Sequence, residues 1–250
     1  MSPKQNRKRL DLLLVERGLA ESRHKAQAMI LAGEVAVNGL PGAKAAQLVA
    51  DDARLQVRSR LQKYASRAGL KLEGALEDFA VSPAALVCLD AGASTGGFTD
   101  CLLQHGAKRV YAVDVTVNQL AWKLQQDPRV VRIERNAREL SGKDVPERVD
   151  LAVVDVSFIS VTKVLAAVAS VAGPAADFLI LIKPQFELSR RQVGRGGIVR
   201  DERLHEEAVQ RVSRAAEAAG FTILGVRPSR LPGAEGNREF FLHARRRAVE

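Results

Sequence analysis

Residues 90–97, which read Asp-Ala-Gly-Ala-Ser-Thr-Gly-Gly, constrain the fold of this chain more than any other stretch. They follow the apolar run 86–89 and precede residues 98–103, which have the spacing of an amphipathic helix. A buried strand, a glycine-rich turn and a helix N-terminus in succession are typical of the crevice in which α/β proteins bind nucleotide cofactors. Glycines let the backbone of such a turn approach a ligand closely. The segment therefore predicts a nucleotide-type site.

The acidic residues around this turn indicate which cofactor it would bind. The first position is Asp90, whose charge would repel the pyrophosphate of a dinucleotide. A carboxylate suits a cofactor with a positive centre, such as the sulfonium and amino group of S-adenosylmethionine. Asp114 ends the next predicted strand at a spacing suited to ribose hydroxyls. Glycine-rich turns also occur without a ligand, but this second acid favours an S-adenosylmethionine site.

The length of 250 residues and the hydrophobic content of 46% fit one large domain, or a medium domain with a small partner. We expect a small α+β domain over residues 1–60, a linker over 61–65 and an α/β domain over 66–250. Ser66 is placed to cap a helix that ends near Phe79. A class I (Rossmann-like) methyltransferase sheet of seven strands is expected, with strands at 86–89, 109–113, 130–134, 150–154, 178–182, 221–226 and 238–244 and helices near 97–105, 117–126, 159–172 and 203–219.

The N-terminal quarter is basic: residues 1–64 hold 12 Lys/Arg against 6 Asp/Glu, within a chain of net charge +9. Such a module predicts a polyanion partner, most simply nucleic acid, although a solvated basic surface gives the same count. A helix capped by Ser22 would carry Arg23, His24 and Lys25 in its first turn, where cations oppose the helix dipole. A bound phosphate would relieve that conflict.

One apolar stretch, residues 164–182, is long enough to be mistaken for a membrane span and carries a single charge, Asp177. Gly173-Pro174 interrupts it, which favours a helix, a turn and a buried strand. The basic start of the chain is followed by a charged amphipathic segment, unlike a secretory signal. We therefore expect a soluble, cytoplasmic protein in which Cys88 and Cys101 are small buried side chains rather than a disulfide.

Polar residues follow three predicted strands directly: Asp90, Asp155 and Lys183. In an open parallel sheet, ligands gather beyond the carboxyl ends of the strands. Lys183 comes after five apolar residues and before Pro184, so it is not expected to be a solvated surface charge. A salt bridge at the sheet edge is the alternative to a role in catalysis. Asp155, on the presumed neighbouring strand, favours catalysis.

These residues together resemble the TlyA family of 2′-O-ribose rRNA methyltransferases, which joins a small RNA-binding module, named after a ribosomal protein, to an FtsJ-like domain. The resemblance covers nearly all of the chain in order. It is carried by residues 9–11, 22–39, 66–72, 89–99, 155–160, 183–187 and 236–242.

The resemblance implies a catalytic Lys-Asp-Lys-Glu group at Lys71, Asp155, Lys183 and Glu239. A ribose hydroxyl must lose its proton as the methyl group transfers, and Lys183 could take that proton or stabilise the developing alkoxide. Asp155 and Glu239 would orient Lys183, and Lys71 would add positive potential. The chemistry requires no metal, and the sequence lacks His/Cys ligand spacing.

The resemblance and the motifs also lead to expectations about the partners, the cofactor-binding residues and the RNA-binding residues. The resemblance implies ribosomal RNA or ribosomal subunits as the partner, with no membrane and no obligate protein partner. Loop 190–197 is expected to be mobile and to close on RNA, or to be flexible without a role. The expected cofactor-binding residues are Asp90, Gly92, Ser94, Gly96, Gly97, Phe98, Asp114, Asn136 and Asp155, and the expected RNA-binding residues are Arg9, Arg23, His24, Lys25 and Arg195.

Three other functions stay open. Relatives have carried the label haemolysin, but aromatic residues are only 4% of the chain, and no helix combines a cationic face with a large aromatic one. An RNA-binding factor without turnover is disfavoured by the complete Lys-Asp-Lys-Glu group. A small-molecule methyltransferase is disfavoured by the basic N-terminal module.

Overall fold

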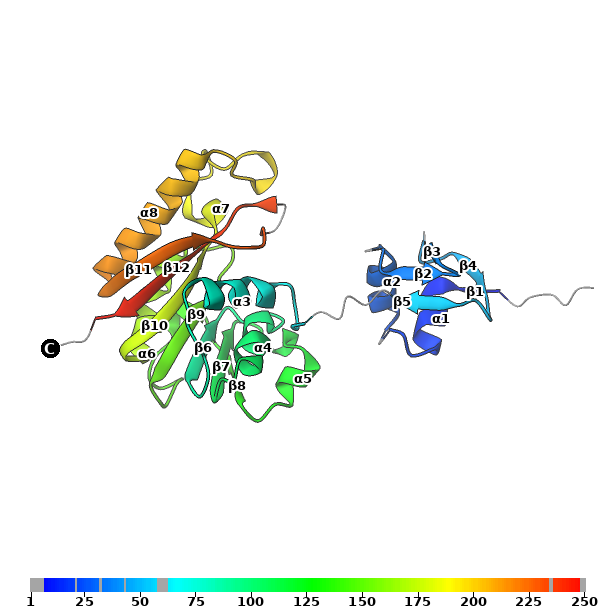
Figure 1. The fold of residues 1–250 in the computed structure, drawn as a ribbon, viewed down its shortest axis with the longest axis horizontal. Coiled ribbons are helices and arrows are strands. Elements are labelled where there is room, and N and C mark those ends of the chain that lie inside the picture. The colour runs from blue at the N-terminus through cyan, green and yellow to red at the C-terminus, as the bar shows by residue number, and fades with distance from the viewer. Residues whose placement is uncertain are drawn as a thin grey trace, which may run out of the picture. The chain divides into compact units, whose positions relative to one another are not determined.

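The computed structural model describes residues 7–20, 22–31, 33–42, 44–57, 63–233 and 236–247, except for the side chain of Arg195. The chain forms two compact units, Met1–Gln62 and Lys63–Glu250 (Figure 1). Of the expected linker 61–65, residues 61 and 62 lie outside the described residues. Tyr64, by contrast, is 1% exposed and donates a 2.9 Å hydrogen bond from its hydroxyl to Glu73, so it packs within the second unit.

The first unit packs two helices against short strands around a small apolar core. A two-residue turn, Asn38-Gly39, joins β2 to β3 with both φ angles positive (51° and 84°), as a type I′ hairpin requires. Ser22 accepts a 3.2 Å hydrogen bond from the Lys25 N–H and caps the second helix as predicted. The elements are β1 (Arg7–Arg9), α1 (Leu10–Glu16), α2 (Arg23–Leu31), β2 (Val35–Val37), β3 (Leu40–Pro41), β4 (Leu48–Ala50) and β5 (Leu55–Val57).

The second unit is built on a seven-stranded sheet with the order β11-β12-β10-β9-β6-β7-β8, in which β12 runs antiparallel to both its neighbours. This is the predicted class I methyltransferase sheet. Its strands are β6 (Val87–Ala91), β7 (Arg109–Asp114), β8 (Val130–Glu134), β9 (Val149–Val154), β10 (Ala172–Ile182), β11 (Phe221–Pro228) and β12 (Phe240–Arg246), and its helices are α3 (Ala68–Asp78), α4 (Gly97–Gln104), α5 (Trp122–Gln125), α6 (Leu165–Val171), α7 (Pro184–Glu187) and α8 (Glu202–Ala218).

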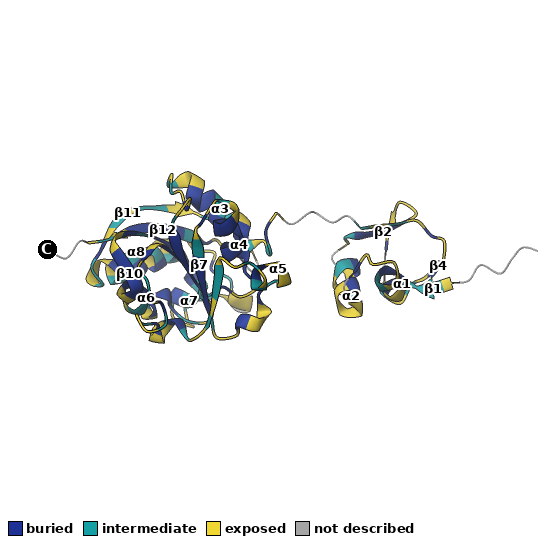
Figure 2. Cartoon of the chain, turned by 90° about the horizontal axis from the view of Figure 1, so that it is seen from below, coloured by how far each residue is buried: buried dark blue, intermediate teal, exposed yellow. Residues whose placement is uncertain are grey.

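Both faces of the sheet are covered, which is why its central strands read as unbroken apolar runs. Along β10, Phe178, Ile180 and Ile182 join the core under α6 and α8, whereas Leu179 and Leu181 join the core under α3 and α4. The buried strands between the helices are dark blue in Figure 2, and the outer helix faces are largely exposed. Cys88 and Cys101 are buried free thiols, as predicted.

Two predicted helices are interrupted. The expected helix 117–126 is divided into a 3-10 turn (η1, Val117–Gln119) and α5, because Ala121 is extended and donates from its N–H to the Thr95 carbonyl at 3.1 Å. The expected helix 159–172 is likewise divided into η3 (Val161–Lys163) and α6. Ser160 caps η3.

The prediction that Ser66 caps the third helix was wrong. That helix, α3, begins at Ala68 with Arg67 as its N-cap. Ser66 packs against the glycine turn instead, since a Cβ on Gly97 would lie 2.2 Å from its hydroxyl oxygen.

The apolar stretch 164–182 folds as α6 and the long strand β10, not as one continuous helix. Within the described ranges, no helix is long and apolar enough to cross a membrane.

Candidate functional site

The glycine turn lies at the point where the strand order reverses. The chain runs outward from β6 to β7 and β8 and then returns to pair β9 with the other side of β6. Gly92, directly after β6, has a φ of +97°, and a Cβ there would lie 2.1 Å from the backbone oxygen of Asp155. The close approach of these two loops therefore requires glycine, and ligands of open α/β sheets bind at such a switch point.

Two neighbouring hollows of about 340 and 160 Å³ form the crevice at this edge. Asp114 and Asn136 line the larger hollow, and Phe98 and Lys183 line the smaller. The residues that line both are Gly92, Ser94, Asp155 and Ser157. The crevice thus extends continuously from the acid that ends β7 to the lysine that ends β10.

The larger hollow has fixed polar groups. The Asp114 carboxylate accepts hydrogen bonds from the backbone N–H groups of Ser94 (2.9 Å) and Thr116 (3.1 Å). Ser94 holds a left-handed backbone, with a φ of +48°, at this turn. Asn136 caps a 3-10 helix (η2, Ala137–Glu139) by accepting from the Arg138 N–H at 3.1 Å. The two backbone N–H groups thereby orient the Asp114 carboxylate beside the turn, as a site for ribose hydroxyls requires.

Asp90 is a predicted cofactor-binding residue that is absent from the walls of both hollows. It is completely buried, and one carboxylate oxygen accepts from the Thr99 hydroxyl at 2.7 Å. The other oxygen, Oδ1, is buried without a hydrogen-bond partner among the described residues. Burial raises the pKa of the Asp90 carboxyl to about 7. This acceptor at the turn fits a cationic ligand group.

At the other end of the crevice, Lys183 is held by two oxygens. Its ammonium nitrogen lies 2.5 Å from Asp155 Oδ1 and donates a 2.7 Å hydrogen bond to the Ser157 hydroxyl. The Lys183 side chain is 11% exposed and that of Asp155 is 16% exposed. A charge in this position is only partly solvated, so its field acts strongly on a bound group.

Lys71 and Glu239 form a second ion pair at 2.6 Å, with side-chain exposures of 13% and 2%. The antiparallel register pairs Ile182 with Phe240, and Lys183 and Glu239 are the residues next to this pair. The four residues implied by the resemblance therefore gather at one edge as two ion pairs. Within the described residues, no group of three or more His, Cys, Asp and Glu side chains could hold a metal ion.

Two residues of the crevice, Ser157 and Phe158, lie in the 155–160 motif but were not among the predicted site residues. Phe158 lines the larger hollow, is 88% exposed and has a φ of +67°, a rare conformation for an aromatic residue. Phe186 lies 5.5 Å from it, centroid to centroid. Ser157 and Phe158 follow Asp155 within three positions, and this closeness was the sequence signal that could have identified them. Their exposure depends on how the loop after β9 folds.

Loop 190–197 contacts the beginning of α8. The Gln192 side chain donates to both carboxylate oxygens of Glu207 at 2.9 and 3.0 Å, and Gly197 accepts from the Asn237 amide at 2.9 Å. The Arg195 side chain lies outside the described residues, so its expected role on RNA stays a prediction.

In the first unit, two of the expected RNA-binding residues contact a buried acid. Asp11 is 0% exposed and accepts hydrogen bonds of 3.0 Å from both Arg9 and Arg23 and of 2.9 Å from Gln27. The Arg9 guanidinium and these neighbours hold the pKa of Asp11 well below its ordinary value. Arg23 therefore has a partner inside the unit. His24 and Lys25 are exposed on the same turn.

Each of the two units matches a known protein family. Residues 64–246 match the FtsJ-like methyltransferase family and residues 8–51 match the S4 domain. A 16S/23S rRNA (cytidine-2′-O)-methyltransferase, TlyA, of Mycobacterium tuberculosis is 49% identical over 96% of this chain and 90% of its own length. Hemolysin A of Brachyspira hyodysenteriae is 44% identical over 94% of this chain and 98% of its own length.

A solved structure from Streptococcus thermophilus, provisionally named a hemolysin, is also similar. It superposes with a TM-score of 0.76 at 40% identity and covers 97% of this chain and 90% of its own.

Proposed function

Because this chain belongs to the TlyA family of FtsJ-like rRNA methyltransferases, we propose that it transfers a methyl group from S-adenosylmethionine to the 2′-hydroxyl of cytidine in ribosomal RNA. One observation carries the proposal. The lysine that would act on the ribose hydroxyl lies at one end of a crevice whose other end has the groups for a nucleoside cofactor.

The residues of the crevice fit S-adenosylmethionine. Asp114 is oriented to accept from the ribose hydroxyls, and Asn136 lines the same hollow. The glycines at positions 92, 96 and 97 keep the turn free of side chains, and Ser94 and Phe98 line the crevice beside them. The orphaned Asp90 oxygen provides negative potential for the amino group or sulfonium. When bound, this cofactor supplies an electrophilic methyl carbon.

Lys183 would act on the acceptor hydroxyl. Asp155 and Ser157, which line both hollows, hold its nitrogen in the smaller one. As an amine it accepts the hydroxyl proton; as an ammonium it stabilises the negative charge that develops on the ribose oxygen. Much of the acceleration would come from alignment, because a rigid crevice holds oxygen, carbon and sulfur in line.

The remaining two residues of the group, Lys71 of α3 and Glu239 just before β12, would support the reaction indirectly. Glu239 is almost fully buried, and Lys71 neutralises it. The ion pair holds the segment before β12 against α3. Because the two charges neutralise each other, the pair adds no net charge there. Neither residue lines a hollow, so Lys71 and Glu239 would act by positioning this segment and not by touching the substrate.

The first unit would dock the enzyme on RNA. The S4 domain match and the excess of basic residues in the first 64 positions support this part of the proposal. Lys25 and His24 are exposed at the start of α2, beside Arg9 and Arg23. We further propose that the protein acts in the cytoplasm on ribosomal RNA or subunits, without an obligate protein partner.

The experiment that tests the proposal is methyl transfer from radiolabelled S-adenosylmethionine to purified ribosomal subunits that lack the modification. We expect label on a cytidine 2′-oxygen of one or both subunits, mapped by its resistance to alkaline cleavage. Absence of label in both subunits, with cofactor binding intact, would contradict it.

The names of relatives make membrane activity the alternative function. Leakage of dye from liposomes by the same preparation would support that alternative. We expect no leakage.

A further inference from the structure

A cavity of about 440 Å³ lies between α8 and the strands β11 and β12, and it shares no described lining residue with the methyl-transfer crevice. The half-buried ring of Phe240 forms one wall, with the His205 ring 5.7 Å away. The Arg238 guanidinium carbon lies 5.4 Å from the Phe240 centroid. The guanidinium thus lies over the aromatic ring, and a guanidinium plane is a surface on which proteins stack an unpaired RNA base.

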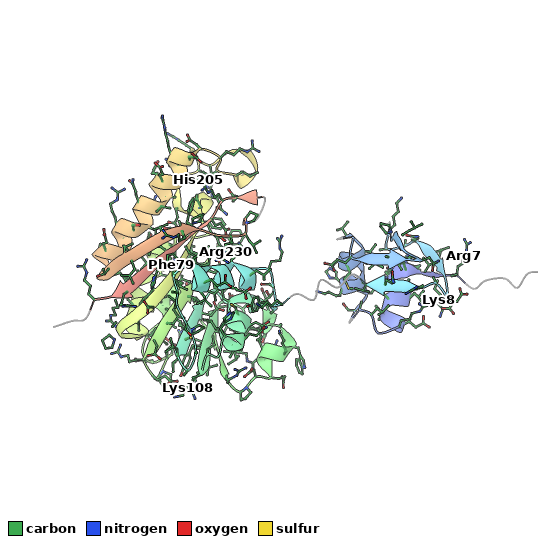
Figure 3. All side chains as sticks on the ribbon, viewed as in Figure 1. Arg7, Lys8, Phe79, Lys108, His205 and Arg230 are labelled. Atoms are coloured by element: carbon green, nitrogen blue, oxygen red, sulfur yellow. The ribbon has the colours of Figure 1, made fainter. Side chains whose placement is uncertain are left out.

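His205, labelled on α8 in Figure 3, lines this cavity and carries a buried ring nitrogen without a partner among the described residues. The residue is 6% exposed, and its Nε2 lies 3.0 Å from the Val199 carbonyl oxygen. A carbonyl only accepts, so Nε2 carries the hydrogen and Nδ1 is the acceptor. Nδ1 is buried without a partner among the described residues. Since an unpaired buried acceptor is costly, the site favours a ligand with an N–H donor.

The charges at the cavity favour a neutral ligand group over a phosphate. Two carboxylates, Glu202 and Glu206, and two guanidiniums, Arg227 and Arg238, line it. Arg238 and Glu202 approach to 3.4 Å, so their charges offset each other. The carboxylates and the imidazole nitrogen are acceptors. A flat, neutral group with an exocyclic amino group fits them, as in cytosine, adenine or guanine; uracil lacks that donor.

The cavity lies at the same sheet edge as the crevice, on the opposite face. Phe240 packs on the core under α8, whereas Glu239, one residue earlier, bonds to Lys71 of α3. Successive residues of an extended segment point to opposite faces. The Lys71–Glu239 pair and the cavity therefore lie on opposite faces of the same end of β12.

We propose that this cavity binds an unpaired, amino-bearing base of the RNA substrate close to the nucleotide that is methylated. The proposal rests on the proposed function, in which RNA is the substrate, and adds to it a second base-binding site. It gives the enzyme a preference for cytosine, adenine or guanine over uracil at that neighbouring position.

Imidazole NMR on the full chain tests the site directly. The chain has four histidines, so ¹⁵N-labelled histidine gives few signals, and His205→Asn identifies the relevant one. Cytidine monophosphate is expected to shift the His205 Nδ1 resonance, and uridine monophosphate is not. His243, whose Nε2 lies 2.8 Å from Asp177, is the internal control. No shift with cytidine monophosphate, or equal shifts with both nucleotides, would overturn the proposal.

Kinetics on ribosomal subunits tests the consequence for RNA. Arg238→Ala removes an exposed side chain at the mouth of the cavity, and Arg203→Ala removes an exposed arginine of α8 outside it. Loss of one stacked base contact is expected to raise KM for subunits about tenfold in Arg238→Ala, with kcat and cofactor affinity unchanged. Arg203→Ala should leave KM unchanged.

The kinetic outcomes separate the two proposals. An unchanged KM in Arg238→Ala would overturn the base site while wild-type methylation still supports the proposed function. If the wild type transferred no methyl group to either subunit, the proposed function would fail. The nucleotide titration would then still decide whether the cavity binds a base.

Discussion

Lys183 and Glu239 flank the last paired residues of β10 and β12, Ile182 and Phe240, yet each forms an ion pair with a different residue. Lys183 contacts Asp155 and Ser157 across the parallel pair β9–β10, whereas Glu239 contacts Lys71 of α3. The site therefore separates into a lysine that faces the crevice and a buried pair behind it. The two pairs should respond differently to substitution.

Lys183→Ala should lower kcat for methyl transfer by about 10² to 10⁴-fold, the usual contribution of a positioned acid–base group. Cofactor affinity should change little, because Asp114 and Asn136, which would hold the nucleoside, line the larger hollow, and Lys183 lines only the smaller one. Filter-based methyl transfer and calorimetric cofactor titration measure the two quantities. Lys163→Ala, an exposed lysine of η3, is the matched control. Wild-type turnover in Lys183→Ala would exclude Lys183 from the chemistry.

Lys71→Met should destabilise the second unit by about 3 kcal/mol, because it leaves the Glu239 carboxylate buried at 2% exposure without its partner. The double variant Lys71→Met with Glu239→Gln should recover most of that loss, since neither charge remains. Urea unfolding of the two variants measures the difference. Equal stability of the single and double variants would show that the pair is not coupled.

The strands and the turn could be predicted because their signals are local. Residues 178–182 are apolar without interruption since both faces of β10 are covered, and the turn after β6 needs its glycines for close approach. The choice of partner for Glu239 could not be predicted, because it depends on contacts between residues 168 positions apart. The cap predicted at Ser66 was wrong for the same reason, because the contact of Ser66 with Gly97 joins residues far apart in the sequence.

The pH dependence of stability should show the buried Asp90 carboxyl. Its pKa is raised from 3.8 in an unfolded chain to about 7 in the fold. Between these values the folded protein holds a proton that the unfolded chain has released, so stability falls as pH rises from about 4 to 7. Three pH units correspond to at most about 4 kcal/mol. Asp90→Asn should flatten this dependence and raise stability at pH 8, as measured by chemical denaturation.

The same carboxyl should link cofactor binding to proton release. If Asp90 acts on the positive centre of S-adenosylmethionine, affinity should rise with pH through about 7, as the carboxyl ionises. Calorimetry at pH 6 in buffers of different ionisation enthalpy should detect about one proton released per site in the wild type and none in Asp90→Asn. Proton release that is unchanged in the variant would assign it to another group.

RNA docking by the first unit is best tested at Lys25, because Arg23 is paired with the buried Asp11. Arg23→Glu would set a second carboxylate beside Asp11 and unfold the unit, so a loss of RNA affinity there would be ambiguous. Lys25 is exposed and has its backbone N–H capped by Ser22, so Lys25→Gln leaves the fold intact. We expect weaker binding to ribosomal RNA and a salt dependence shallower by about one unit in the logarithmic slope, as for one lost phosphate contact. Glu34→Gln, three residues past the other end of α2, should not weaken binding. An unchanged slope in Lys25→Gln would move the docking surface away from the start of α2.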